Sequence, residues 1–370
     1  MNKFWNYEIN NYVDPKPGAI DNYKLKGKFY DDCTSLFDII GTFPHPSLRL
    51  PVGKEHIEPT FLTFQHILID INTVRILSQL LINSKIISLK FSSNSFELVV
   101  LESLITALLT KTNTIFTLVY EWNHTVKLEN TKDVISWGKP EKPIEKQDIH
   151  YDLLSKVHLQ LARIGTSTKI ESLCLRGNYL GDDAVIMLLD NMKNNNTLKV
   201  LNLYNNRITS KSFAVFCKFL ETNKKLEEVH FGKNELVDDD LVLLRKSLGK
   251  YLMTLEEVDT QQKKIKDRDL ILEKNKKLKA QKKPEEPIPF VEESEQIGEN
   301  FYIFKNTKLK SINLMQNNFK NCYDLVISVF RQTDALFITL DSVLFDKEQK
   351  HNLTYPSLNL NFSSRIYLSK

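Results

Sequence analysis

The chain contains 370 residues, 42% of them hydrophobic and 26% charged, with a formal net charge of +4. That apolar content is sufficient for one elongated domain or for two, and the small net charge argues against a nucleic-acid partner. Because no run approaches the roughly eighteen apolar residues of a membrane span and the first residues form no signal peptide, we expect no membrane partner and a cytoplasmic or cytoskeletal protein.

Residues 1–56 are predicted to form an N-terminal extended arm or a cap. Aromatic residues are scattered there among prolines and polar residues: Phe4, Trp5, Tyr7, Tyr12, Tyr23, Phe29 and Tyr30. These side chains can pack over the open end of the following domain, or they can dock on a neighbouring protein, because aromatic residues are favoured interface anchors.

A recurring pattern over residues 57–250 indicates leucine-rich repeats. In LKVLNLYNNRI, residues 198–208, apolar residues fill positions one, four, six and eleven, and Asn fills position nine. The pattern also starts 28 residues earlier at Ile170 and 28 residues later at Leu226. Further copies start at Ile86 and Leu309, a weaker one at Ile115, and degraded ones at Ile57 and Phe337. This spacing is the leucine-rich-repeat consensus.

Each copy predicts a strand, a turn and a helix. Alternating apolar residues describe a short strand with one face inward, and repetition stacks such strands into a parallel sheet. Asn at position nine can both donate and accept, so it can satisfy the backbone of the turn. The predicted Asn ladder consists of Asn94, Asn123, Asn178, Asn206, Asn234 and Asn317. Asp182 and Thr209 or Ser210 are placed to cap helices, and Gly249 is placed to end one.

The predicted fold class is therefore an α/β leucine-rich-repeat solenoid, a horseshoe with a parallel concave sheet and convex helices, interrupted by insertions. Its period resembles that of the ribonuclease-inhibitor subclass of leucine-rich repeats. Positions five and seven point outward from the concave face, which makes this face either a partner-binding surface or an ordinary solvated one. The candidate partner-binding residues there are Arg176, Asn202, Tyr204, His230 and Met315.

Two insertions interrupt the repeats. The first, at about residues 124–150, is either a binding loop on the rim or a tolerated surface loop. The second, residues 251–300, begins with a run of strong helix formers and ends with an acidic, proline-containing linker. Its predicted helix is rich in basic residues, which are either solvated or in contact with an acidic partner. The candidate residues of this basic arm are Lys263, Lys264, Lys266, Arg268, Lys274, Lys276 and Lys277.

After the second insertion, residues 301–345 are predicted to form one or more returning repeats, and residues 346–370 a C-terminal tail. This order of elements resembles a known family. The helix DDDLVLLRKSLGK at residues 238–250, the element YLMTLEEV at 251–258, the charged helix and the lone repeat at 309–319 look like the leucine-rich repeat-containing protein seventy-one family. The resemblance covers about residues 165–330, and this chain has a much shorter insertion than the family.

The resemblance implies a non-enzymatic component of the motile-cilium axoneme, in a large complex with other axonemal proteins, including tubulin or coiled-coil proteins. No phosphate-binding, zinc or nucleophile motif is found in the sequence, so we expect no catalytic residue, no cofactor, no metal and no small-molecule substrate. The alternative is a regulator of a small GTPase, because Ran GTPase-activating proteins resemble the same repeat subclass. Those proteins have an acidic C-terminal tail, whereas this sequence ends in NLNFSSRIYLSK, which favours the structural class.

Overall fold

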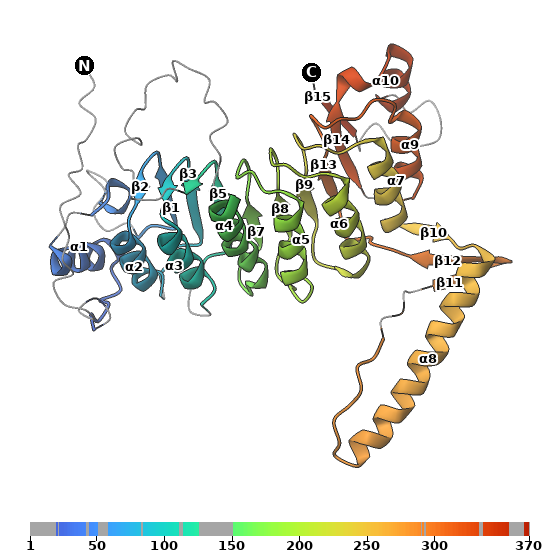
Figure 1. Ribbon diagram of the computed structural model, residues 1–370, viewed down its shortest axis with the longest axis horizontal. Helices are drawn as coiled ribbons and strands as arrows, with labels where there is room; N and C mark the ends of the chain where they lie inside the picture. Colours follow the sequence, from blue (N-terminus) through green and yellow to red (C-terminus); the bar gives the residue numbers. More distant parts are fainter. Residues whose placement is uncertain are drawn as a thin grey trace. The chain divides into compact units, whose positions relative to one another are not determined.

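The chain forms an α/β repeat solenoid. A computed structural model describes residues 20, 22–41, 44–50, 58–82, 84–110, 114–125, 151–289, 291, 294–332, 336–354 and 366–369. Within these ranges, nine strands form the main sheet in the order β1-β3-β5-β7-β8-β9-β13-β14-β15 (Figure 1). The chain divides into two compact units, residues 1–174 and residues 175–370.

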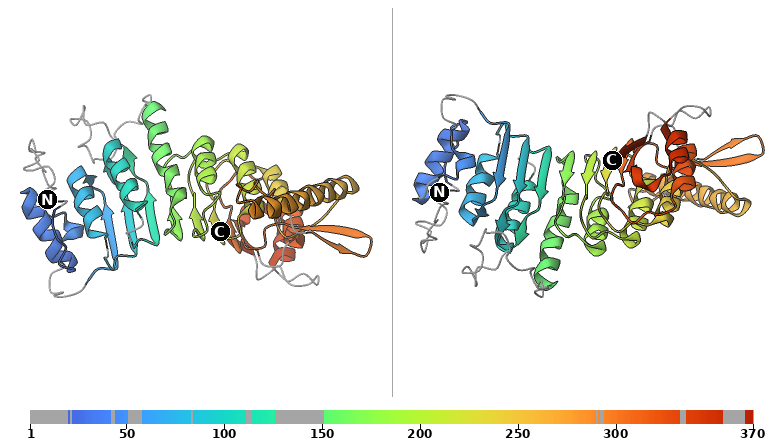
Figure 2. Two further views of the ribbon diagram at one scale, coloured as in Figure 1. Left: turned by 90° about the horizontal axis from the view of Figure 1, so that it is seen from below. Right: turned by 90° about the horizontal axis from the view of Figure 1, so that it is seen from above.

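The first unit alternates strands and helices. Its elements are α1 (Phe29–Ile40), β1 (Phe61–Gln65), β2 (Leu68–Ile69), α2 (Ile71–Leu80), β3 (Ser88–Ser92), β4 (Ser95–Phe96), α3 (Leu98–Leu108), β5 (Thr117–Glu121), β6 (His124–Thr125), α4 (Tyr151–Arg163) and β7 (Ser172–Cys174). The long strands run parallel, and α2, α3 and α4 lie side by side on one face of the sheet (Figure 2). Strand β5 pairs with β3 on one side and directly with β7 on the other. Because the first predicted insertion lies between β5 and β7 in the sequence, the stack of strands continues across it.

Burial alternates along each strand of the first unit, which places one row of large apolar side chains in the core. Leu62, Leu89, Leu118 and Leu173 are in register across four neighbouring strands. Two residues further along the same strands, the rings of Phe64 and Phe91 stack with their centroids 5.0 Å apart.

The structure corrects the phase of the first copy. Sequence spacing placed its start at Ile57, but β1 pairs with β3 so that Leu62 lies opposite Leu89 and Phe64 opposite Phe91. The side chains of Leu62 and Phe64 are buried, so the strand of this copy has a complete apolar face rather than a degraded one. The repeat here is 27 residues long, because Leu62 and Leu89 occupy the same position. Ile67 takes the place of Asn, and its backbone N–H donates to the next Asn of the ladder, Asn94.

Part of the predicted N-terminal arm is helical. Helix α1 packs against α2, and Phe29 and Leu36 are buried. The aromatic residues before residue 20 and residues 126–150 of the first insertion lie outside the described residues.

The second unit continues the alternation and adds a projection. Its elements are α5 (Asp182–Asn191), β8 (Val200–Asn202), α6 (Ser210–Thr222), β9 (Glu228–His230), α7 (Asp238–Ser247), β10 (Lys250–Leu252), α8 (Leu255–Ala280), β11 (Ser294–Ile297), β12 (Asn300–Phe304), β13 (Ser311–Asn313), α9 (Tyr323–Gln332), β14 (Phe337–Asp341), α10 (Lys347–Thr354) and β15 (Ile366–Ser369). Strand β13 pairs directly with β9, and α7 packs between α6 and α9, so only the residues from β10 to β12 leave the repeat stack. They contain α8 and a small antiparallel sheet, β10-β12-β11, where only a helix and a linker were expected.

The last part of the chain also differs from the sequence expectation. Strand β14 pairs with β13 so that Ile338 lies opposite Ile312, which shifts this copy by two residues from the expected start at Phe337. Ile338 and Leu340 are fully buried. Residues 366–369, expected in a tail, form a further parallel strand, β15.

The Asn ladder connects each turn to the preceding one. Asn234 donates from Nδ2 to the carbonyl of Leu203 at 3.1 Å and to that of Phe231 at 2.9 Å. Its Oδ1 accepts the backbone N–H groups of Asn206 at 3.1 Å and Ile208 at 3.2 Å. Side-chain bonds of the same kind are made by Asn94, Asn123, Asn206 and Asn317. Asn178 is buried at the equivalent turn.

The residue before each ladder Asn adopts a left-handed backbone conformation. These residues are Ser93, Trp122, Gly177, Asn205, Lys233 and Gln316, and His66 takes the same conformation before Ile67 of the first copy. Their φ angles are between 53° and 57°, except for Gly177 at 69°. A side chain disfavours this region by about 1–2 kcal/mol, so the turn imposes a conformation that most of these residues would not choose.

Carboxylates at helix starts link successive repeats of the second unit. Asp182, the first residue of α5, accepts the backbone N–H groups of Thr209 at 2.9 Å and of Ser212 at 3.3 Å, at the start of α6. Asp238, the first residue of α7, accepts the backbone N–H groups of residues 320–321. Thr209 is the N-cap of α6, whereas Asp182, expected to cap its own helix, stabilises the next one. Burial acts to raise the pKa of Asp182, but hydrogen bonds from Ser212 and Thr209 lower it below the usual value.

Asp240, in the first turn of α7, is a buried carboxylate with incomplete hydrogen bonding. It is 1% exposed. Its Oδ2 accepts the N–H of Val237 and the hydroxyl of Ser210, both at 2.8 Å. Within the described part of the chain, its buried Oδ1 accepts no hydrogen bond. Burial raises the pKa of Asp240 above its usual value, although these two hydrogen bonds oppose the shift.

Candidate interaction surfaces

The outward face of the sheet in the second unit carries two rows of side chains. Position five of successive repeats places Asn202, His230 and Asn313 in register. Position seven places Arg176 and Tyr204 beside Gly232 and Met315, as the hydrogen bonds between the following residues show. Arg176 and Tyr204, at position seven, and His230, at position five, belong to three successive repeats, as their spacing predicts.

Tyr204 is the centre of the position-seven row. The guanidinium carbon of Arg176 lies 4.7 Å from the centroid of its ring, at the distance of a cation–π interaction. Its hydroxyl reaches across one repeat and donates to Oε1 of Gln316. A Cβ atom at Gly232 would lie 2.8 Å from Cδ2 and Cε2 of the ring, so the ring occupies the space above this glycine. Arg176, Gln316 and Gly232 therefore hold the side chain of Tyr204 in one orientation.

The position-five row has a different character. Asn202 uses its Oδ1 to accept the backbone N–H of Tyr204 at 2.9 Å, and Asn313 does the same for Met315 at 3.0 Å. Both asparagines thus shape the end of their own strand, which the sequence did not predict for Asn202. His230 Nε2 lies 2.7 Å from Oε1 of Glu228, and its side chain is 27% exposed. A row of this composition offers partly exposed polar groups beside the Arg176–Tyr204 pair.

The predicted basic arm is helix α8. It begins with a capping box in which Thr254 and Glu257 exchange hydrogen bonds. Six of the seven predicted residues are exposed: Lys263, Lys264, Lys266, Lys274, Lys276 and Lys277. Arg268 is half-buried and pairs with Asp269 at 3.0 Å, and Lys274 pairs with Glu286. The arm thus presents a positive surface that its own acidic residues partly neutralise.

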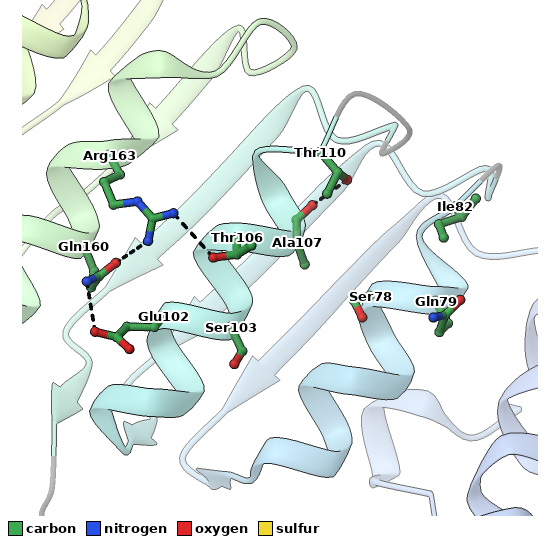
Figure 3. A pocket seen from close by; sticks show the side chains of 10 residues that line it. All are labelled: Ser78, Gln79, Ile82, Glu102, Ser103, Thr106, Ala107, Thr110, Gln160 and Arg163. Carbon is green, nitrogen blue, oxygen red and sulfur yellow. Dashed lines mark hydrogen bonds between the residues drawn. The ribbon is translucent and has the colours of Figure 1, made fainter. Parts of the chain in front are cut away.

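A shallow groove lies between the helices of the first unit (Figure 3). Its volume is about 670 Å³, and small side chains of α2 and α3 form its floor, including Ser78, Ser103 and Ala107. At one end, Arg163 donates to Gln160 at 2.5 Å, and Gln160 donates to Glu102 at 3.0 Å. This groove was not predicted from the sequence, although small residues recur on α3 at helical spacing.

The described side chains form neither a metal site nor a cluster of reactive thiols. Within the described ranges, no group of three His, Cys, Asp or Glu side chains is placed to hold a metal ion. Burial raises the pKa of Cys33 and of Cys322 to about 12, so both thiols are protonated at neutral pH. None of the helices described here combines the length and apolarity required to span a membrane.

Comparison with known proteins places the chain in no family. No protein-family model matches it, and no curated protein matches it. Among solved structures, it is similar to a chain of the crystal structure of the Rad7 and Elc1 complex in yeast, with 11% sequence identity and a TM-score of 0.29. The similarity covers 75% of this chain and 62% of that chain, so the protein spans less than two thirds of this neighbour. The assignment as a repeat solenoid rests on the sheet and the Asn ladder.

Proposed function

We propose that the protein is a non-enzymatic scaffold for protein–protein interaction and that a partner binds the sheet face of its second unit. The observation that carries this proposal is the arrangement of Tyr204, which Arg176, Gly232 and Gln316 hold in place. Tyrosine and arginine dominate binding energies at protein interfaces. A side chain that is already ordered before binding loses little conformational entropy when a partner arrives.

We further propose that the assembly is the axoneme of a motile cilium. The resemblance of residues 165–330 to a ciliary leucine-rich-repeat family supports this location. The exposed lysines of α8 support an acidic partner for the arm, such as tubulin or an acidic coiled coil. On this proposal the protein needs no cofactor, metal or small-molecule substrate.

Cross-linking mass spectrometry of isolated cilia tests both parts of the proposal. Lys199 and Lys233 flank the sheet face, and the lysines of residues 263–283 report on the arm. We expect the double variant Arg176→Ala and Tyr204→Ala to lose cross-links from Lys199 and Lys233 while it keeps those from the arm. Val119→Ala, at position five of a repeat in the first unit, is the matched control and should keep both sets.

Three outcomes would count against the proposal. Unchanged cross-links in the double variant would remove the sheet face as the binding surface. Absence of the protein from cilia, with detection elsewhere in the cell, would remove the axonemal location. Faster GTP hydrolysis by a small GTPase upon addition of the protein would replace the scaffold with the regulator alternative.

A further inference from the structure

A proline-rich segment follows α8 and runs back beside it (Figure 1). Residues 283–289 read KPEEPIP and belong to no helix, strand or turn. Each proline fixes its own φ near −65°, and each residue before a proline is restricted to extended conformations. These two effects constrain the three prolines and the three residues that precede them, which leaves only Glu285 unrestricted. The segment is therefore biased towards a polyproline II helix.

Helix α8 holds this segment at its midpoint. The side chain of Asn275, which is 4% exposed, donates from Nδ2 to the carbonyl of Glu286 and accepts the N–H of Glu286 at Oδ1, both at 2.7 Å. The ammonium group of Lys274 also pairs with the Glu286 carboxylate. One residue of the segment is thus fixed to the helix through its backbone and its side chain.

The remaining side chains of the segment are presented to solvent. A polyproline II helix has three residues per turn, so Pro284 and Pro287 share one edge, and Glu285 and Ile288 share the next. Glu286 marks the third edge, which faces α8. All four residues on the first two edges are exposed, and Ile288 is 51% exposed. A segment that its prolines bias towards the polyproline II helix therefore displays a Pro-x-x-Pro edge beside an apolar side chain.

We propose that residues 283–289 are the ligand of a partner domain whose groove is lined by aromatic side chains. Such grooves bind Pro-x-x-Pro segments because the polyproline II conformation is formed in advance and its carbonyls are open to hydrogen bonds. The exposed Lys282 and Lys283 lie directly before the first proline, so the groove should have acidic residues at the corresponding end. This site is separate from the sheet face and does not depend on the scaffold proposal for that face.

Binding of the full chain to a panel of purified SH3, WW and EVH1 domains tests this inference. We expect at least one domain with an acidic patch beside its groove to bind, and a synthetic proline-rich ligand of that domain to displace the chain. The double variant Pro284→Ala and Pro287→Ala should bind about tenfold more weakly, as the loss of one buried anchor predicts. Gln262→Ala, an exposed change on α8, is the control and should bind like the unaltered chain.

The inference would be overturned if no domain of the panel bound the chain. It would also be overturned if the double variant bound within about twofold of the unaltered chain, or if the proline-rich competitor failed to displace it. Circular dichroism of the variants separates loss of the motif from loss of the fold. Because the segment lies outside the repeat core, replacing its prolines should leave the helix signal unchanged.

Discussion

Replacing Asn234 by Ala tests how much one rung of the Asn ladder contributes to stability. The residue is 6% exposed, and its side chain makes hydrogen bonds to five backbone groups, three carbonyls and two N–H groups. The three carbonyls, those of Leu203, Phe231 and Gly232, keep a second partner, because Asn206, Asn317 and the backbone N–H of Asn205 also donate to them. Only two N–H groups therefore lose their acceptor.

Those two donors are the backbone N–H groups of Asn206 and Ile208, inside the turn. A buried group without a partner costs about 1–3 kcal/mol, so we expect Asn234→Ala to lower the free energy of unfolding by about 2–6 kcal/mol. Asn234→Asp should be at least as harmful at neutral pH, because a carboxylate oxygen would face the carbonyls that the amide now contacts. The exposed Asn318 is a matched control, and its replacement by Ala should change stability by less than about 0.5 kcal/mol.

Urea unfolding of the full chain measures the global effect, and amide hydrogen exchange at Asn206 and Ile208 measures the local one. The reasoning is refuted if Asn234→Ala costs less than about 1 kcal/mol, or if both amides keep their protection from exchange. Either result would mean that water or a shifted backbone replaces the lost acceptor.

Three further substitutions follow from the second unit. Gly232→Ala should displace the Tyr204 ring and break its hydrogen bond to Gln316, seen as a changed tyrosine signal in near-ultraviolet circular dichroism, and an unchanged signal would contradict the described packing. Because burial raises the pKa of Asp240, ionisation of this carboxyl destabilises the folded chain. The protonated carboxyl therefore contributes to the free energy of unfolding at low pH, and this contribution is lost as the pH rises through the pKa of Asp240 in the folded chain. Asp240→Asn should therefore gain stability relative to the unaltered chain in urea unfolding as the pH rises above about 4, and a difference that shrinks as the pH rises would contradict the reasoning. Lys233→Gly should stabilise by about 1 kcal/mol in the same assay, since φ is 53° there, and Lys233→Ala should show no gain.

The sequence predicted the repeat fold correctly where a copy keeps both its alternating apolar residues and its Asn. Leu173 and Leu118 lie in register as their spacing implies, because apolar alternation and the Asn turn together specify each strand. The first copy was placed two residues too early, at Ile57, because its repeat is only 27 residues long and Ile67 replaces Asn. The small sheet β10-β12-β11 was missed because β10 (KYL) and β11 (SEQI) are only three and four residues long, and because the apolar run of β12 (NFYIF) stands directly after the acidic linker without a repeat pattern of its own. Runs this short are not enough for apolar alternation to indicate a strand.

The candidate surface was predictable only in part. Repeat position assigned Arg176, Tyr204 and His230 to the outward face, because side chains alternate along a strand. The contact of Tyr204 with Gln316 was not predictable, since it depends on Gly232, just after the intervening strand β9, which leaves room for the ring. The linking role of Asp182 was hidden for a similar reason, because its partners lie about 30 residues away in the sequence.

Links between repeats of the second unit run in both directions along the chain. Each ladder Asn completes the turn of the repeat before it, whereas Asp182 and Asp238 complete the helix start of the repeat after it. Removing the repeat that carries Asn234 and Asp238 would therefore leave the turn of the repeat before it, and residues 320–321 of the repeat after it, without their acceptors. The stability of a repeat protein is approximately the sum of the intrinsic stabilities of its repeats and the interactions between neighbouring repeats. Hydrogen bonds of this kind make the interactions between neighbours larger and the intrinsic stability of each single repeat smaller. The second unit should consequently unfold as one cooperative block, with no single repeat acting as a separable module.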